Sequence, residues 1–346
     1  MTMQAAVLGG INDLRLRDVP IPEVGPGEVL LKVEANTICG TDLRIISGAK
    51  TAGVRPGVIM GHEFAGRVAD VGQGIDDIAI GTQATCSIVL SCGRCEACAN
   101  NREHLCAQLS LFGYEIDGGL AEYMLIPRAA MERGNFIPVA EELPPTLLAL
   151  AEPVSCCLNG AHQFNVQPGD TVVVLGTGPI GLIHCALARL AGASTIIASG
   201  RKGRLEPAER LGATHTTSAT GDELLKEIRS ITGGRGADVV IVAVGDLELA
   251  QVALEAAAIG GRVNYFAGFP KGSVATVDVN LIHYKELVVT GGSNARRADV
   301  AQAVRLLSSG ALDLSPLVTH TFPLGELDAA ITAVEQRSGL KVAVTP

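Results

Sequence analysis

After residue 152 the sequence alternates short apolar runs with stretches of helical composition, and this alternation constrains the possible folds most strongly. Residues 171–175 read TVVVL, which is typical of a buried strand, and residues 179–192 form an apolar helical stretch. The alternation continues, with strands expected at 195–198, 238–242, 262–266 and 287–290 and helices at 205–211 and 247–258. Strands separated by helices at this spacing pair in parallel, with helices on the sheet faces. This region therefore predicts an α/β domain built on a doubly wound parallel sheet.

The first 150 residues have a different character and predict a β-rich domain. Residues 28–35 and 61–72 have strand composition and are bounded by glycine and proline. A chain of 346 residues is also too long for one ordinary hydrophobic core. We expect the C-terminal stretch to rejoin the first domain. The predicted division is one domain from residues 1–153 and 294–346, with a second domain inserted at 154–293.

Three glycines join the first strand and the first helix of the alternating region. Gly176, Gly178 and Gly181 follow the strand, and Pro179 and Ile180 open the helix. In such a turn the first glycine permits the tight bend, the second lets a pyrophosphate approach the backbone, and the third allows close packing of helix on strand. The helix N-terminus then favours the phosphates. These residues predict a dinucleotide site, and a glycine-rich turn without a ligand is the alternative.

The end of the second strand of this region bears on the choice of cofactor. An acidic residue there would hydrogen-bond the adenosine ribose of NAD, but the chain has Ser199, followed by Arg201 and Lys202. A serine with nearby cationic groups suits the 2′-phosphate of NADP, which a carboxylate would repel. These residues therefore favour NADP over NAD. The alternative is that the two cations only begin a solvated helix and that NAD binds without its usual acidic contact.

Composition and charge narrow the class of protein. The net charge of −9, with no basic stripe to offset it, argues against a nucleic-acid partner. The first residues have neither a basic region nor a long apolar stretch, and the longest apolar runs are far shorter than a membrane span. Nine cysteines, odd in number and unevenly clustered, fit a reducing compartment. We therefore expect a cytoplasmic protein with no membrane partner.

Four cysteines lie within fifteen residues of the first domain, at Cys92, Cys95, Cys98 and Cys106. Thiolates at two-residue spacing lie close enough in a tight loop to share one tetrahedral metal ion. A closed set of four sulfurs is typical of structural zinc, with no position left for substrate. Two disulfides, a redox pair or an iron–sulfur cluster are the alternatives. Because the rest of the chain fits a reducing compartment, we favour structural zinc.

A second set of metal-ligating residue types lies outside this loop. Cys39 and Asp42 occur in the run CGTD, His62 and Glu63 in GHE, and Glu152 in AEPV just before the predicted second domain. Cysteine, histidine and a carboxylate, with one position left for water, would form an open catalytic zinc site. Taken singly, Cys39 is more simply a buried core cysteine and His62 a hydrogen-bonded turn histidine. The prediction of a catalytic metal therefore depends on the whole set.

Together these motifs resemble those of the zinc-dependent medium-chain alcohol dehydrogenases, over essentially the whole chain and in the family's order. The resemblance implies a Rossmann domain inserted in a GroES-like catalytic domain. It also implies two zinc ions per chain, an oxidoreductase that transfers hydride between a secondary alcohol and NAD(P), and a small-molecule alcohol or ketone as partner. In such enzymes zinc acts as a Lewis acid that lowers the pKa of the bound alcohol.

Within the family, the runs EPVSCCLN and NLIHYKEL look most like the polyol (sorbitol or iditol) branch, whose substrates are sugar alcohols or their phosphates. Threonine or a simple secondary alcohol is the alternative substrate. Outside enzymes, the alternative is a non-catalytic nucleotide-binding sensor, which would not need the residues of the catalytic zinc. Polyol dehydrogenases are often tetramers, so the resemblance also implies a homo-oligomer, either a tetramer or a dimer.

The resemblance further implies the ligands of the catalytic zinc. Cys39 and His62 would bind the ion, and the third protein ligand would be Glu63 or Glu152, because family members differ or exchange at this position. Both carboxylates therefore remain candidates.

Roles around these ligands also follow from the resemblance. Asp42 would orient His62 and fix its tautomer, and Thr41 would hydrogen-bond the substrate hydroxyl. The chain departs from the family at Arg44, where many relatives have a histidine that ends a proton relay. Arginine does not lose its proton in proteins, so the end of the relay is left without a candidate.

Overall fold

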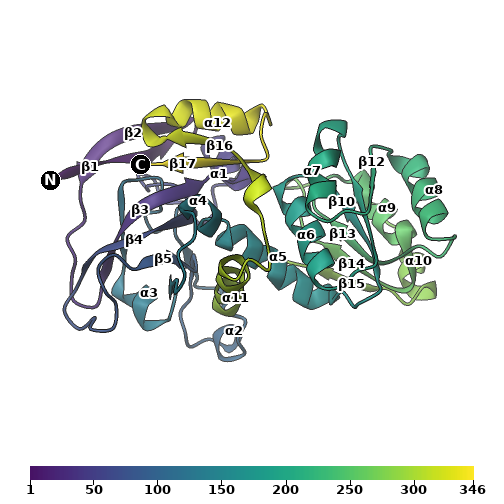
Figure 1. Ribbon diagram of the computed structural model, residues 1–346, viewed down its shortest axis with the longest axis horizontal. Helices are drawn as coiled ribbons and strands as arrows, with labels where there is room; N and C mark the ends of the chain where they lie inside the picture. Colours follow the sequence, from purple (N-terminus) through teal and green to yellow (C-terminus); the bar gives the residue numbers. More distant parts are fainter. The chain divides into compact units, whose positions relative to one another are not determined.

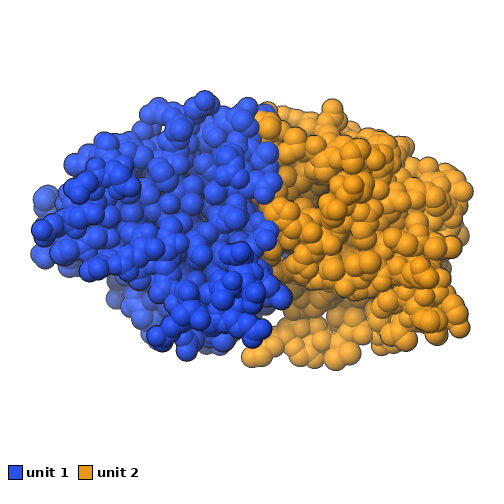
Figure 2. Space-filling model, turned by 90° about the horizontal axis from the view of Figure 1, so that it is seen from below, with its two compact units in different colours: residues 1–155, 294–310, 318–346 blue, residues 156–293, 311–317 orange.

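The computed structural model describes all 346 residues, and the chain divides into two compact units. Unit 1 comprises residues 1–155, 294–310 and 318–346, and unit 2 comprises residues 156–293 and 311–317 (Figure 2). No helix in the chain combines the length and the apolar character that spanning a bilayer requires.

Unit 1 is built on a seven-stranded sheet in the order β16-β17-β3-β4-β5-β9, with β8 also paired to β3 (Figure 1). Its strands are β3 (Val29–Thr37), β4 (Glu63–Val71), β5 (Gln83–Cys86), β8 (Tyr123–Ile126), β9 (Phe136–Pro138), β16 (Val318–Pro323) and β17 (Lys341–Thr345). Strand β3 pairs antiparallel with β4, β8 and β17. The C-terminal strand therefore completes a sheet whose other strands come mainly from the first 140 residues.

Shorter elements surround this sheet. They are the strands β1 (Thr2–Gly10), β2 (Asp13–Pro20), β6 (Val89–Leu90) and β7 (Ser110–Leu111), and the helices α1 (Gly40–Ile46), α2 (Glu96–Ala99), α3 (Arg128–Glu132), α4 (Pro145–Leu148), α11 (Arg297–Ser308) and α12 (Leu327–Glu335). Leu31, Met60, Phe64 and Phe112 are among the residues that form the buried core. This core fixes β3 and β4, the strands whose ends carry most of the candidate catalytic residues.

Unit 2 contains a six-stranded, all-parallel sheet in the order β12-β11-β10-β13-β14-β15. Its strands are β10 (Thr171–Leu175), β11 (Thr195–Ser199), β12 (His215–Thr217), β13 (Ala237–Val242), β14 (Ala257–Tyr265) and β15 (Val288–Gly291). Numbered within the unit, this order is 3-2-1-4-5-6, the doubly wound arrangement of dinucleotide-binding folds. All five residues of β10 are buried, as expected for a central strand covered on both faces.

The helices of this unit cover both faces of the sheet. They are α6 (Pro179–Leu190), α7 (Leu205–Arg210), α8 (Gly221–Ile231), α9 (Glu248–Ala256), α10 (Val279–Tyr284) and the larger part of α5 (Ala151–Phe164). Helices α6 and α7 lie on one face, and α8 and α9 lie on the other (Figure 1). The α/β fold class with a Rossmann sheet is therefore confirmed. The expected helix at 247–258 ends earlier, at Ala256, because Ala257 already enters β14.

Candidate metal centres and cofactor site

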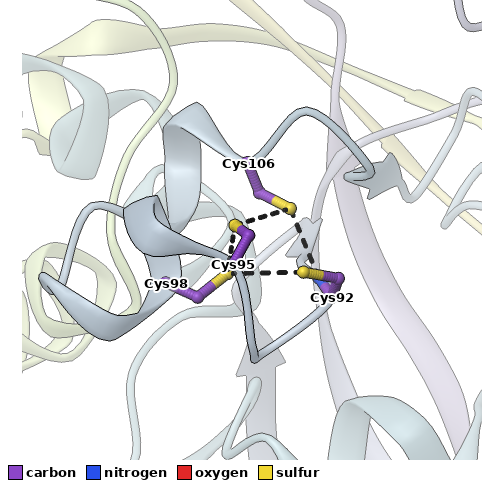
Figure 3. A group of neighbouring side chains, drawn as sticks. All are labelled: Cys92, Cys95, Cys98 and Cys106. Atoms are coloured by element: carbon purple, nitrogen blue, oxygen red, sulfur yellow. Dashed lines mark hydrogen bonds between the residues drawn. The ribbon is translucent and has the colours of Figure 1, made fainter.

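The four clustered cysteines meet in a small lobe of unit 1 (Figure 3). Cys92 follows β6, Cys95 caps the N-terminus of α2, Cys98 lies in α2, and Cys106 follows the short helix η1 (Glu103–Leu105). The Sγ atom of Cys95 lies 3.5 Å from that of Cys98 and 3.7 Å from that of Cys106. The Sγ atoms of Cys92 and Cys98 are 4.0 Å apart. The two-residue spacings thus bring all four sulfurs to one point.

These sulfur distances fit one zinc ion. Four sulfurs at about 2.3 Å from a tetrahedral zinc are roughly 3.8 Å from one another, and the distances here are 3.5 to 4.0 Å. A disulfide would instead bring two sulfurs to about 2.05 Å, and none of these four cysteines forms a disulfide in this structure. The space between the sulfurs accepts a single ion and not a cluster of several irons. The donor set and its geometry therefore suit structural zinc.

Local hydrogen bonds prepare this lobe for a cation. The backbone N–H groups of Arg94 and Cys95 hydrogen-bond the sulfur of Cys92 and lower the pKa of its thiol to about 6. The Sγ atom of Cys106 accepts the backbone N–H groups of Cys92 and Gln108, each at 3.4 Å. Such donors stabilise thiolates, which are the form that binds metal.

A second group of ligand atoms lies at the ends of α1 and β4. The ligand atoms of Cys39, His62 and Glu63 all lie within 4.8 Å of one another. Cys39 caps the N-terminus of α1, whereas His62 and Glu63 stand at the start of β4. Gly61 makes this turn possible, because its φ of +95° suits glycine and a Cβ there would lie 2.6 Å from the backbone nitrogen of Leu120.

Asp42 connects the cysteine and the histidine of this group. One carboxylate oxygen accepts the backbone N–H of Cys39 at 2.9 Å, and the other lies 3.2 Å from Nδ1 of His62. Burial lowers the pKa of His62, but Asp42, Tyr114 and Cys39 together raise it well above the usual value. Because Nδ1 faces Asp42, Nε2 on the opposite side of the ring is the atom that can bind a metal.

The other predicted residues of this site occupy different places. Thr41 is half-buried in α1 beside Asp42, and Arg44 is exposed one turn later. Glu152 is half-buried in the first turn of α5 and does not belong to the group of three ligand atoms. Its charge nevertheless acts on the nearby Tyr114. The structure therefore places Glu63, and not Glu152, in the group with Cys39 and His62.

Three residues that the sequence analysis did not single out lie against this site. Lys341 forms a buried ion pair with Glu63, and the hydroxyl of Thr37 donates a hydrogen bond to the same carboxylate. The ring centroids of Tyr114 and His62 are 5.3 Å apart. Lys341 begins the run KVAVT, and a lysine at the edge of an otherwise apolar strand was the signal available in the sequence.

The glycine motif forms the turn between β10 and α6. Gly176 has a φ of +109°, and its N–H donates to the carbonyl of Ser199 at 2.8 Å. A Cβ on Gly181 would lie only 1.8 Å from the carbonyl oxygen of Gly176, whereas a Cβ on Gly178 would meet no atom within 4 Å. Pro179 and Ile180 occupy the first helical turn. The motif thus combines close helix packing at one glycine with open space at another.

The expected cofactor-selecting residues follow at the end of β11. Ser199 is buried and pairs in register with Leu175 of β10 and Thr217 of β12. Arg201 and Lys202 are both exposed where the next short helix begins. No acidic side chain occurs between Ser199 and Lys202. This end of the strand therefore offers a hydroxyl and two cations.

Comparison with known families agrees with this geometry. Residues 25–134 match the alcohol dehydrogenase GroES-like domain, and residues 179–309 match the zinc-binding dehydrogenase family. The first match contains both groups of metal-ligating side chains, apart from Glu152. The second begins at the helix that follows Gly178.

Individual relatives extend the match to nearly the whole chain. An L-threonine 3-dehydrogenase of Pyrococcus abyssi is 35% identical over 89% of this chain and 87% of its own length. An L-threonine 3-dehydrogenase of Bacillus subtilis is 33% identical, with 96% and 94% covered. These relatives favour the threonine alternative over the polyol branch that the sequence predicted.

A solved structure of a related protein has the same fold as this chain. A protein from Sinorhizobium meliloti 1021 that is described as a zinc-binding dehydrogenase, bound to NADP, superposes with a TM-score of 0.92 at 34% identity. The similarity covers 100% of both chains. With these matches, the chain belongs to the zinc-dependent medium-chain alcohol dehydrogenase family and is an NAD(P)-dependent enzyme that acts on CH–OH donors.

Proposed function

We propose that this enzyme oxidises the secondary alcohol of a 3-hydroxy amino acid of the L-threonine type to a ketone, with NADP as hydride acceptor. The observation that carries the catalytic part of this proposal is the group of Cys39, His62 and Glu63 with Asp42 behind it. A cysteine, a histidine and a carboxylate form the open ligand set of a catalytic zinc. Zinc bound there would polarise the alcohol oxygen and lower its pKa.

The side chains around this group have defined tasks in the proposal. Asp42 holds His62 with Nδ1 protonated and Nε2 directed toward Cys39, which keeps the ligand set in place. The hydroxyl of Thr41 hydrogen-bonds the substrate hydroxyl and orients it. Burial raises the pKa of Tyr114, so its hydroxyl remains a neutral hydrogen-bond donor beside the site. Arg44 is exposed and, as an arginine, does not accept the substrate's proton.

The choice of NADP is supported by the end of β11. Ser199 supplies a hydroxyl, and Arg201 and Lys202 supply cations for a 2′-phosphate. The NADP-bound relative from Sinorhizobium meliloti has the same fold. Replacing both cations by alanine should weaken NADP binding at least tenfold and leave NAD binding within about twofold. Equal losses for both cofactors would contradict this role.

The choice of L-threonine is supported by the relatives, and the polyols are the second candidate because of the runs EPVSCCLN and NLIHYKEL. The test is a kinetic comparison of L-threonine, D-sorbitol and 2,3-butanediol, each with NAD and NADP. We expect the highest kcat/KM for L-threonine with NADP. A higher value for sorbitol would place the enzyme in the polyol branch. Cofactor binding without turnover of any alcohol would favour the nucleotide-binding sensor.

We also propose that two copies of the chain associate through β15. This strand forms one edge of the six-stranded sheet, and Val288 and Val289 on it are 51% and 37% exposed. In the adjoining helix α10, Val279 and Tyr284 are also exposed. An exposed apolar edge strand readily pairs with another strand. Light scattering should therefore give a multiple of 35.7 kDa for the wild type and a smaller species for Val288→Lys.

A further inference from the structure

Lys50 lies close to the candidate catalytic group, and neither the candidate metal ligands nor the cofactor site includes it. Its Nζ atom lies over the ring of Tyr114, 5.3 Å from the ring centre. The centre of the same ring is 5.3 Å from the centre of the His62 ring. One aromatic side chain is therefore next to both the ammonium group and the histidine of the candidate catalytic site.

Backbone contacts fix the loop that carries Lys50. The N–H of Lys50 donates to the carbonyl of Arg44 in α1 at 2.8 Å, and the N–H of Arg55 donates to the carbonyl of Tyr114 at 2.9 Å. The guanidinium of Arg55 also donates to the carbonyl of Glu115 at 3.0 Å. The loop is thus held on one side by α1 and on the other by the segment that contains Tyr114, which sets the position of the ammonium group.

The ammonium group of Lys50 has no carboxylate partner, although it is half-buried. Its one hydrogen bond is a long one, to the carbonyl of Ala52 at 3.4 Å. The carboxylates in the facing segment have other partners, because Asp117 pairs with Arg55 at 2.7 Å and Glu115 accepts a backbone N–H at 3.0 Å. An ammonium group has three donors, so Lys50 keeps at least two for a ligand.

The contact with the tyrosine ring does not by itself require a charge at this position. A cation over an aromatic ring at a partly exposed site stabilises a protein only weakly, and an uncharged side chain of similar length could cover the ring as well. Small-molecule sites, in contrast, fix their ligands with a few well-placed polar or charged groups. A half-buried cation without a counterion, beside a group that would bind an alcohol, fits such a task.

The span between the two groups suits a short hydroxy acid. Lys50 Nζ lies at most twice 5.3 Å from the centre of the His62 ring, because both lie 5.3 Å from the centre of the Tyr114 ring. In L-threonine, three bonds of roughly 1.5 Å each separate the reacting oxygen from the carboxylate carbon. With its hydroxyl at the Cys39–His62 group, the carboxylate can accept a hydrogen bond of about 2.8 Å from Lys50.

We propose that Lys50 binds the anionic group of the substrate and so selects anionic alcohols over neutral ones. For a 3-hydroxy amino acid this group is the α-carboxylate. The inference rests on the proposed function, in which the alcohol reacts at the Cys39–His62 group. A phosphate presents the same anionic oxygens, so a sugar-alcohol phosphate is the other source of the anion. A neutral polyol has no group that matches this ammonium.

Two alcohols that differ only in the carboxylate test the proposal. They are L-threonine and (R)-1-amino-2-propanol. Lys50→Met removes the charge, and the lost hydrogen bond to an anion should lower kcat/KM for L-threonine about 30-fold, mainly through KM. The value for the aminopropanol should stay within about twofold. If Lys50 only supported its loop, both substrates would lose equally, which would overturn the proposal.

Two further variants are matched to this one. Lys50→Arg keeps the cation and should retain kcat/KM for L-threonine within about fivefold. Lys32→Met removes an exposed lysine from β3 of the same unit and should change neither substrate, because Lys32 only alters the net charge. The ratio of the two kcat/KM values does not depend on the amount of folded enzyme, so a partly unfolded variant still gives a result.

A binding measurement gives the comparison without turnover. L-Threonine is titrated into the enzyme–NADPH complex, and the fluorescence of NADPH reports the ternary complex. The Kd should rise about 30-fold in Lys50→Met, and an unchanged Kd would contradict the proposal.

These results separate the role of Lys50 from the proposed substrate. If the wild type preferred sorbitol 6-phosphate to L-threonine, and Lys50→Met removed that preference, the threonine proposal would fail and the anion-binding role would stand. If the wild type preferred L-threonine, and Lys50→Met kept its preference over the aminopropanol, only the role of Lys50 would be refuted. A wild type that oxidised neutral sorbitol as well as its phosphate, and L-threonine poorly, would refute both.

Discussion

An added methyl group should affect stability at one glycine of the motif and cofactor affinity at another. In Gly181→Ala the new Cβ would lie 1.8 Å from the carbonyl oxygen of Gly176, whereas carbon and oxygen normally approach to about 3.3 Å. The backbone of α6 and the turn must therefore separate by roughly 1.5 Å. Overpacking in a core typically costs 1–3 kcal/mol, and a clash with backbone should cost at least about 3 kcal/mol.

Gly178→Ala is the matched control for stability and the test of cofactor binding. Gly178 has a φ of −76°, which suits alanine, and its Cβ would meet no protein atom within 4 Å. We expect its unfolding free energy to change by less than about 0.5 kcal/mol. The methyl group would instead occupy space that a pyrophosphate needs, and NADPH should bind at least about tenfold more weakly.

Urea unfolding and NADPH titration measure the two effects separately. The chain has no tryptophan, so the fluorescence of NADPH itself reports binding without a protein signal from that residue. The expected pattern is lost stability for Gly181→Ala and lost affinity for Gly178→Ala. If Gly178→Ala bound NADPH as tightly as the wild type, the phosphates would not lie on this turn and the reasoning would be refuted.

The remaining predictions concern one residue each. Asp42→Asn should lower zinc affinity and kcat/KM about 10- to 100-fold, because it weakens the contact that orients His62; a chelator assay and steady-state kinetics would show wild-type values if this contact were unimportant. Cys95→Ser should leave one zinc per chain and lower the unfolding temperature, and a stable protein with two zinc ions would contradict the structural assignment of the lobe. His184 is fully buried, and burial lowers its pKa to about 3. Below about pH 6.5 the unfolded chain protonates this histidine, whereas the folded chain keeps it neutral. The free energy of unfolding is therefore highest above that pH and falls by about 2 kcal/mol at pH 5. Urea unfolding at pH 7.5 and pH 5 should show this loss for the wild type and a loss about 2 kcal/mol smaller for His184→Leu.

The parallel sheet was predictable because local sequence carries its signal. Strands buried on both faces read as continuous apolar runs such as TVVVL, and a glycine motif between strand and helix fixes their order. The sequence did not predict the helix at Gly221–Ile231, although Leu224, Leu225 and Ile228 form its buried face. Its few apolar residues lie among many polar ones, and no glycine motif marks its start.

The two groups of metal-ligating residues differ in how far the sequence alone predicts their geometry. The cysteine lobe is local, and its spacing alone predicts four converging sulfurs. In contrast, Lys341 and Glu63 are 278 residues apart, and only the pairing of β17 with β3 brings them together. Which of Glu63 and Glu152 lies with Cys39 and His62 also depends on the folded chain, so no local pattern could show it. Local sequence patterns do not identify the substrate either, and for the substrate the relatives favour threonine over a polyol.

The central claim is that the Cys39–His62 group holds a second, catalytic zinc, and metal analysis of one substitution tests it most directly. The wild type should contain two zinc ions per chain and oxidise its alcohol. Cys39→Ser should contain one zinc, unfold at nearly the wild-type temperature and show no turnover. One zinc per chain in both proteins, or full activity in the folded Cys39→Ser variant, would contradict the account.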